Sequence, residues 1–155
     1  MSESTFFTYN TPVGRVTIAS NGCAITAIAI GEVGLQGARK PSPLTNDAAN
    51  QLQEYLAGRR RYFDLPLDPA GSPFQKKVWR EMLDIPYGST KTYGEIACAV
   101  GSPRGARAVG MAANRNPIAI VIPCHRVLAS NGKQGGYAYG VEVKRFLLDL
   151  ERRSN

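Results

Sequence analysis

The sequence predicts an α+β protein with two parts, a small N-terminal unit of strands plus a helix and a mainly helical C-terminal part. The first part shows aromatic and β-branched runs separated by turn residues, which is the pattern of strands. The second part shows apolar residues at four-residue spacing, which is the pattern of helices. The 155 residues, 43% apolar and 20% charged, suffice for one or two small domains with a buried core.

Strands and turns fill the beginning of the N-terminal part. Thr5–Tyr9 is aromatic and β-branched, and Asn10–Gly14 carries turn chemistry. Two further runs, residues 15–19 and 23–30, either alternate between apolar and polar residues or are continuously apolar, as expected for the strands of a β-meander. The Gly- and Pro-rich segment 31–45 is expected to be a loop, and this part of the chain holds no chemical motif.

A helix and a linker complete the N-terminal part. Asn46 or Asp47 can cap the helix, and Gly58 ends it. The segment Asp68–Pro73 is the best candidate for a linker between two domains, because the net charge of the sequence also changes there. The residues before Ser72 hold six bases and six acids, so the net charge of +7 belongs to the remainder. We therefore expect two domains, over residues 1–68 and 69–155.

Capping residues mark three helices in the C-terminal part. Ser72 suits the cap of the first helix, and a capping box at Thr92 begins a second, short helix. After a break at Gly101, a third helix is expected over residues 102–114. Two short helices separated by a Gly-containing turn are the signature of a helix-turn-helix.

The third helix is basic and thin, since it combines arginines with small residues: Arg104, Arg107 and Arg115, with Ala106, Ala108 and Gly110 among the small ones. Such a helix can approach a nucleic-acid backbone closely, or it can pack tightly against a neighbouring helix. Its place in the basic half favours a polyanionic partner. Charge alone leaves DNA, RNA and an acidic membrane surface open.

A cysteine lies beside the single histidine of the chain. The apolar run 118–122 is expected to be a buried strand that ends at Pro123, and Cys124 and His125 follow directly. A thiolate is the nucleophilic form of cysteine, and a nearby imidazole is the usual means of generating it near neutral pH. The alternatives are a small buried cysteine and a core histidine bonded to a carbonyl group.

The three cysteines predict neither disulfides nor a metal site. Their number is odd and their spacing is not that of a disulfide framework, which suits a reducing cytoplasm. Cys23 and Cys98 also lack the paired spacing of structural zinc ligands. No apolar run reaches the roughly 18 residues of a membrane span, and the N-terminal residues do not read as a signal peptide. We therefore expect a cytoplasmic location without a membrane partner.

The segment Asn116–Val127, which contains Pro123-Cys124-His125-Arg126, closely resembles the active-site signature of the methylated-DNA–protein-cysteine methyltransferases, the O6-alkylguanine-DNA alkyltransferases. Further matches follow in order along the chain: Gly71–Gln75, Val78-Trp79, Ile85–Gly88, Arg107–Gly110, Gly135–Tyr137 and Glu142–Leu148. The resemblance implies a ribonuclease H-like N-terminal domain and a C-terminal DNA-binding domain with a winged-helix-like helix-turn-helix. It also implies a suicide enzyme, which transfers the alkyl group of O6-alkylguanine irreversibly to its own cysteine.

The resemblance assigns five catalytic roles. Cys124 would attack the alkyl carbon in an in-line displacement. His125 would take the thiol proton through a water molecule, and Glu151 would hold and polarise the histidine. Asn116 would organise the turns that support the site. Tyr93 would lie at the guanine pocket and donate a proton or a hydrogen bond to the departing base.

The resemblance also assigns DNA contacts and a pocket. The alkylated nucleotide must leave the base stack, with Arg107 taking its place while the third helix lies in the minor groove. Further DNA contacts are expected at Arg104, Ala106, Ala108, Gly110 and Arg126. The pocket would include Tyr93 with Tyr137, Ala138 and Tyr139. Ala138 and Tyr139 depart from the Ser-Gly that the family commonly has there, and we expect Tyr139 to narrow or cover the pocket mouth.

The expected partner is duplex DNA that contains O6-alkylguanine, bound by a monomer without a cofactor. Activity on O4-alkylthymine and cooperative binding are left open. Two other functions are weighed against repair. A binding-only damage sensor would have another residue in place of Cys124. A methylation-responsive regulator would need an additional DNA-binding module, for which 155 residues leave no room.

Overall fold

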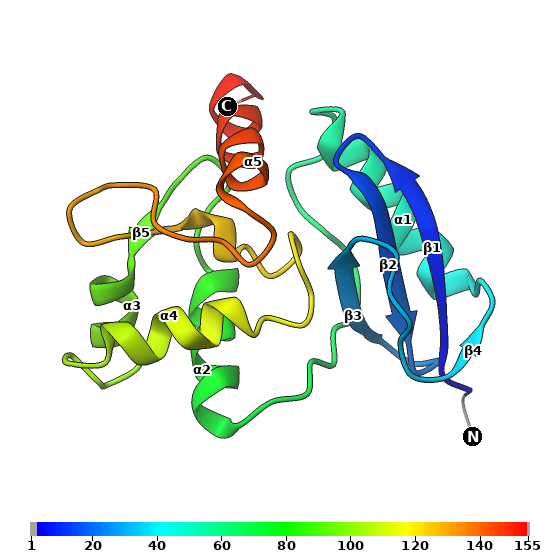
Figure 1. Cartoon of the computed structure of the whole chain (residues 1–155), viewed down its shortest axis with the longest axis horizontal. Helices are drawn as coiled ribbons and strands as arrows, with labels where there is room; N and C mark the ends of the chain where they lie inside the picture. The colour runs from blue at the N-terminus through cyan, green and yellow to red at the C-terminus, as the bar shows by residue number, and fades with distance from the viewer. Residues whose placement is uncertain (1–2, 155) are drawn as a thin grey trace. The chain divides into compact units, whose positions relative to one another are not determined.

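Four strands and one helix form the first of two units into which the chain divides (Figure 1). The computed structural model describes residues 3–154. The first unit comprises the chain up to Ala70 together with Pro117–Ala119, and the second comprises Gly71–Asn116 and the residues from Ile120 onward. In the described part of the chain no helix is long and apolar enough to cross a membrane.

The sheet of the first unit has the strand order β3-β2-β1-β4. Strands β1 (Thr5–Thr11), β2 (Gly14–Ser20) and β3 (Ile25–Ile30) are antiparallel, as the sequence predicts, and the short β4 (Ala38–Arg39) lies parallel to β1. Helix α1 (Pro43–Leu56) contacts β1, β2 and β3. These contacts bury one face of the helix, so the first unit has a core of its own.

Helix α1 begins earlier than the sequence predicts. Its cap is Ser42 rather than Asn46 or Asp47: the Ser42 hydroxyl accepts from the Thr45 amide at 3.2 Å, and the Thr45 hydroxyl accepts from the Ser42 amide at 2.9 Å. This reciprocal pair satisfies two amides that would otherwise lack partners, and Pro43 suits the first helical position. The two later residues therefore lie inside the helix.

The run 118–122 is not the strand predicted from its apolar sequence. Only Ile118 forms a parallel bridge, to Ile28 of β3, where the Ile28 amide donates to the Pro117 carbonyl and the Ala119 amide to the Ile28 carbonyl, both at 2.9 Å. Ile120 has a φ of +71°, a conformation that turns the chain away from an extended path. The apolar composition reflects burial, because all five side chains are almost completely enclosed.

Four helices make up most of the second unit: α2 (Pro73–Leu83), α3 (Tyr93–Ala99), α4 (Ala106–Asn114) and α5 (Val141–Ser154). Strands β5 (Lys91–Thr92) and β6 (Val127–Leu128) pair in parallel, and the 3-10 turn η1 (Cys124–Arg126) precedes β6. The predicted caps at Ser72 and Thr92 are confirmed, each as part of a capping box.

Helices α3 and α4 pack against each other as a helix-turn-helix, with α2 packed against both (Figure 1). Gly101, with a φ of +81°, begins the turn between them. Helix α4 starts at Ala106 rather than at residue 102, because Gly105 precedes it without a side-chain cap and the preceding residues form turns. Trp79 of α2 fixes the packing, since its indole donates to the Ala112 carbonyl at 2.9 Å.

Candidate active site and DNA-binding surface

Cys124 sits in η1 with a buried thiol, only 5% of the residue being exposed. Its Sγ accepts a hydrogen bond from the Asn116 side-chain amide at 3.3 Å. The same amide donates to the Ile122 carbonyl at 2.8 Å. Asn116 therefore ties the end of α4 to the turn that presents the cysteine, which is the geometry expected of a residue that organises the site.

Burial raises the pKa of the Cys124 thiol above its ordinary value. The hydrogen bond from Asn116, the positive charge of Lys144 and the hydroxyl of Tyr137 act in the opposite direction without cancelling the effect of burial. The neutral thiol is therefore the resting form near neutral pH. A nucleophilic role then requires a base that removes the proton during the reaction.

His125 is completely buried and bonded to a carboxylate, with 2.7 Å between its Nε2 and Oε2 of Glu151. Burial lowers the pKa of His125, and the hydrogen bond and charge of Glu151 oppose that shift without reversing it. The imidazole is therefore neutral at pH 7. Because a carboxylate can only accept, Nε2 carries the hydrogen, and Nδ1 keeps the lone pair that a general base needs.

Arg126 does not lie on a DNA-binding surface, so this part of the prediction is wrong. The residue is 7% exposed, and its guanidinium forms two hydrogen bonds to Glu151, at 2.8 and 3.0 Å. A third donor binds the Ile85 carbonyl at 2.7 Å, and the guanidinium lies over the ring of Tyr87. The buried carboxylate requires a compensating charge, and Arg126 is the residue that supplies it.

Glu151 thus accepts hydrogen bonds from two segments of the second unit, η1 and the turn after α2. His125 and Arg126 come from η1, and the Gly88 amide donates from the turn after α2 at 3.0 Å. Together these bonds fix the carboxylate in one orientation. The structure therefore brings Glu151 to the histidine, although the two residues are 26 positions apart in the chain.

Two tyrosines adjoin the thiol. The pKa of Tyr137 is raised well above its ordinary value, by burial first and by Cys124 second. The pKa of Tyr93 is raised by the same two causes in the same order. Tyr139 packs edge-on against Tyr137, with ring centroids 5.8 Å apart. Tyr139 therefore packs against a residue that itself adjoins the cysteine thiol. Ala138, which separates the two tyrosines in the sequence, is exposed.

Lys144 is a site residue that the sequence analysis did not single out. Its buried ammonium donates to the carbonyls of Val127 and Gly136, at 2.7 and 3.0 Å, and lies 6.0 Å from the centre of the Tyr93 ring. Burial lowers its pKa to about 8, while Cys124 acts in the opposite direction. Lys144 is seven residues before Glu151, so both charged residues fall on the apolar stripe of α5, a signal that could have identified it.

A hollow of about 540 Å³ lies over α3, α4 and the loop after β6. Its lining includes four residues predicted for the pocket or for DNA contact, namely Tyr93, Ala106, Arg107 and Gly110, together with Gly94, Met111, Asn114, Ala129, Ser130 and Gly136. The predicted residues Arg104, Ala108, Tyr137, Ala138 and Tyr139 are not part of this lining. Arg104 and Ala108 are nevertheless exposed beside it, on or next to α4.

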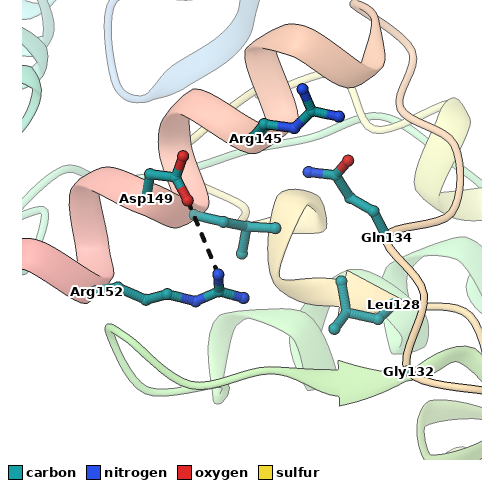
Figure 2. Close-up of a pocket in the computed structure, with 7 residues that line it drawn as sticks. Leu128, Gly132, Gln134, Arg145, Asp149 and Arg152 are labelled. Carbon is teal, nitrogen blue, oxygen red and sulfur yellow. Dashed lines mark ion pairs between the residues drawn. The ribbon is translucent and has the colours of Figure 1, made fainter.

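A second hollow, of about 270 Å³, lies on the exposed side of α5 (Figure 2). Arg145, Asp149 and Arg152 line it from the helix, and Gln134 faces them from the loop after β6. Asp149 and Arg152 form a long ion pair of 3.8 Å. No residue predicted for the site lines this hollow, so the candidate site is the first hollow and the buried network next to it.

Sequence comparison accounts for both halves of the chain. Residues 6–69 match the ribonuclease-like domain of 6-O-methylguanine DNA methyltransferase, and residues 73–153 match the DNA binding domain of the same family. The chain belongs to the 6-O-methylguanine DNA methyltransferase family. The predicted α+β fold class, with its sheet-containing first part and helical DNA-binding second part, is confirmed by these matches.

Individual methyltransferases of this family are similar over nearly the whole chain. The methylated-DNA–protein-cysteine methyltransferase of Mycobacterium tuberculosis is 44% identical over 149 residues, which cover 94% of this chain and 90% of the relative. The constitutive enzyme of Bacillus subtilis is 43% identical and covers 96% of each chain. A crystal structure of Mycobacterium tuberculosis OGT in complex with DNA superposes with a TM-score of 0.91 at 42% identity, over 97% of this chain and 94% of that one.

Proposed function

We propose that this methyltransferase repairs duplex DNA by moving the alkyl group of O6-alkylguanine onto Cys124, once per protein molecule. The observation that carries the proposal is the buried arrangement of Cys124 next to His125, whose ring is bonded to Glu151 at 2.7 Å. A nucleophile, a base and a residue that orients the base are the parts that alkyl transfer to a thiol requires. The relatives named above are methylated-DNA–protein-cysteine methyltransferases, which supports the same reaction here.

In the proposed reaction the thiol proton of Cys124 passes to His125 through a water molecule. The thiolate sulfur attacks the alkyl carbon from the side opposite the guanine oxygen. As the S–C bond forms, the C–O6 bond breaks and its electron pair remains on the base, which Tyr93 stabilises by donating a hydrogen bond or a proton. The products are a thioether on Cys124 and unmodified guanine. The thioether has no route back to a thiol, so the protein acts once.

Arg126 contributes to the neutral resting state of His125 in this scheme. A carboxylate alone would stabilise the imidazolium and raise the pKa of the histidine. Burial is the largest cause that lowers the pKa of His125, and the positive charge of Arg126 lowers it further. The two hydrogen bonds from Arg126 also offset part of the charge of Glu151. The histidine therefore starts the reaction neutral and can accept the proton from the cysteine.

DNA binding is assigned to the exposed face of α4. The alkylated nucleotide must be turned out of the stack before the thiol can reach it. We place α4 in the minor groove, with Arg107 filling the gap in the stack and Arg104, Ala106, Ala108 and Gly110 next to the backbone. Small side chains suit this position because the minor groove is only about 6 Å wide.

Further parts of the proposal concern the pocket and the state of the protein. Tyr137, Ala138 and Tyr139 are assigned to the pocket wall, with Tyr139 restricting large alkyl groups. The reaction needs one protein molecule per lesion, so we propose a monomer that acts in the cytoplasm. We also propose that residues 1–68 and 69–155 are separate domains, with the reaction confined to the second.

The proposal is tested with an oligonucleotide that contains O6-methylguanine. After incubation, the intact mass of the protein should rise by one methyl group, and peptide mapping should locate it on Cys124. Cys124→Ser should show no mass increase while still binding the oligonucleotide. Tight binding by the wild-type protein without transfer would contradict repair and would indicate a damage sensor instead.

A further inference from the structure

Met111 is an exposed apolar residue on the helix that we assign to DNA. It is 62% exposed, more than any other large apolar side chain described in the second unit, where Val141 and Leu83 follow at 46% and 44%. The remaining exposed positions of α4 carry small or polar side chains. A single exposed methionine is common on protein surfaces, so a function for Met111 has to be argued from the residues around it.

The surroundings of Met111 are those of the candidate base pocket. Met111 lines the 540 Å³ hollow together with Arg107, Gly110 and Asn114, which lie four residues before, one before and three after it on the same helix. The opposite side of α4 is buried, through Val109, Ala112 and Ala113. Met111 therefore cannot rotate into the core, and its side chain extends from the face that carries the proposed stack-filling arginine.

We propose that Met111 is a positioning residue that packs as an apolar wedge against the minor-groove edge of the nucleotide next to the flipped one. This inference rests on the proposed function. Side chains four residues apart on a helix have Cβ atoms about 5–6 Å apart, and successive base pairs are about 3.4 Å apart along the duplex. If Arg107 occupies the gap, Met111 reaches one to two steps along the groove from it.

The chemistry of methionine suits this place. The minor-groove walls present C–H groups of deoxyribose, and apolar side chains including Met are inserted there by other proteins that kink DNA. An unbranched, flexible thioether can adapt its shape to the apolar walls of the groove. Gly110 next to Met111 leaves room on the helix surface, since a Cβ at that position would meet no atom within 4 Å. Contact with Met111 would hold the groove open and keep the target nucleotide out of the stack.

The test compares Met111→Ala and Met111→Leu with Val141→Ala, a matched change at an exposed apolar residue outside the hollow. Base flipping is followed by the fluorescence of 2-aminopurine next to the lesion, and methyl transfer by single-turnover kinetics at subsaturating DNA. Met111→Ala should lower the transfer rate and the flipping equilibrium about five- to tenfold, the loss expected for one apolar contact. Met111→Leu should restore both to within about twofold, and Val141→Ala should match the wild type.

The salt dependence of DNA affinity separates a wedge from a charged or merely structural role. Met111→Ala should leave the slope of affinity against salt concentration unchanged, because no phosphate contact is lost. Equal behaviour of Met111→Ala and Val141→Ala would overturn the inference, as would faster transfer by Met111→Ala, which would indicate an obstructing side chain. If the wild-type protein is active, either of these results would refute only the role of Met111 and not the proposed repair function. Absence of transfer by the wild type would refute the proposed function itself.

Discussion

At the residue scale, the site combines a thiol whose pKa is raised with a histidine whose pKa is lowered. Neither group is charged at rest, so the buried site needs no permanent thiolate–imidazolium pair. Of the charges that it does contain, Glu151 and Arg126 compensate each other through two hydrogen bonds, and Lys144 donates to two backbone carbonyls. Ionisation of the thiol therefore requires a base that takes its proton.

Replacement of His125 by Ala should change how the transfer rate depends on pH. In the wild type, the rate should be nearly flat above pH 6.5 and fall only below it, because burial lowers the pKa of His125 from 6.5. In His125→Ala only the thiolate fraction reacts, and burial raises the pKa of Cys124. The rate should then be low at pH 7 and rise about tenfold per pH unit up to pH 9. Single-turnover kinetics across pH 6–9 measure both profiles, and parallel profiles would exclude His125 as the base.

Replacement of Tyr139 by Gly should widen the range of alkyl groups accepted. The Tyr139 ring packs on Tyr137, which adjoins the thiol, so its removal opens space toward the reacting sulfur. Transfer from a benzylated guanine should accelerate at least several-fold, while transfer of a methyl group should change little. Tyr62→Gly, which removes an exposed tyrosine from the other unit, is the matched control. An unchanged rate with the benzyl substrate would show that Tyr139 does not restrict the pocket.

At the element scale, α5 holds the active site together from one helical stripe. Lys144 and Glu151 are two turns apart on its buried side, with Leu147 and Leu148 between them. Glu151 is bonded to the histidine at 2.7 Å, and Lys144 joins β6 to the loop that lines the hollow, through the carbonyls of Val127 and Gly136. The loop that we assign to substrate binding is therefore positioned by a helix that contacts no DNA in our proposal.

Replacement of Lys144 by Met should loosen that loop. The buried Val127 carbonyl and the more exposed Gly136 carbonyl lose their donor, and a buried group left without its partner typically costs about 1–3 kcal/mol of unfolding free energy. Lys133→Met, the same change at an exposed lysine of the loop, should cost much less. Denaturant unfolding measures the difference, and hydrogen exchange should increase at residues 129–136 in Lys144→Met alone. Equal stability and exchange in the two variants would mean that the lysine does not restrain the loop.

The elements of this fold differ in how far local sequence determines them. The cap at Ser72, the capping box at Thr92 and the strand alternation near the N-terminus act over a few residues, so they could be predicted. The start of α1 was predicted too late, because Ser42 forms its box with a threonine rather than the usual Glu or Gln. The run 118–122 was wrongly predicted to be a strand, because its residues are apolar on account of burial rather than strand pairing. In addition, nothing in the local sequence indicates the positive φ of Ile120.

The residues of the candidate site also differ in how far the local sequence identifies them. The Cys124-His125 pair is adjacent in the chain and could be recognised directly. The role of Glu151 depended on family resemblance, because only the folded chain brings it within 2.7 Å of the histidine. Arg126 was predicted to contact DNA from the family resemblance, whereas the buried carboxylate of Glu151, 25 positions along the chain, binds it. Lys144 was overlooked for the corresponding reason, since its partners are backbone carbonyls in other segments.

At the scale of the whole molecule, the positive charge is concentrated in the residues from Ser72 onward, with 13 bases and 6 acids. Arg126, Lys144 and Glu151 are buried, so 11 bases and 5 acids remain to act on a partner, a net charge of +6. Most of these bases should attract phosphates without regard to sequence, which suits a protein whose lesions occur in any sequence context.

Substitutions of Arg107 and Lys133 should distinguish the filling of the base stack from the general attraction of DNA phosphates. Lys133→Ala should weaken DNA binding mildly and reduce the slope of log affinity against log salt by up to about one unit. Arg107→Ala should slow methyl transfer by at least tenfold at saturating DNA, because the vacated position in the stack is no longer filled. Affinity is measured by fluorescence anisotropy over a range of salt concentrations, and transfer by single-turnover kinetics. Equal effects of the two variants on the transfer rate would contradict the distinct role of Arg107.

The central claim is a single transfer to Cys124, and the most direct measurement is the stoichiometry of transfer. The protein is incubated with a tenfold excess of duplex carrying isotopically labelled O6-methylguanine, and protein-bound label is followed to completion. We expect a plateau of one methyl group per protein molecule, all of it on the Cys124 peptide and none in Cys124→Ser. Label on another residue, or demethylated guanine in excess of the protein, would contradict the account.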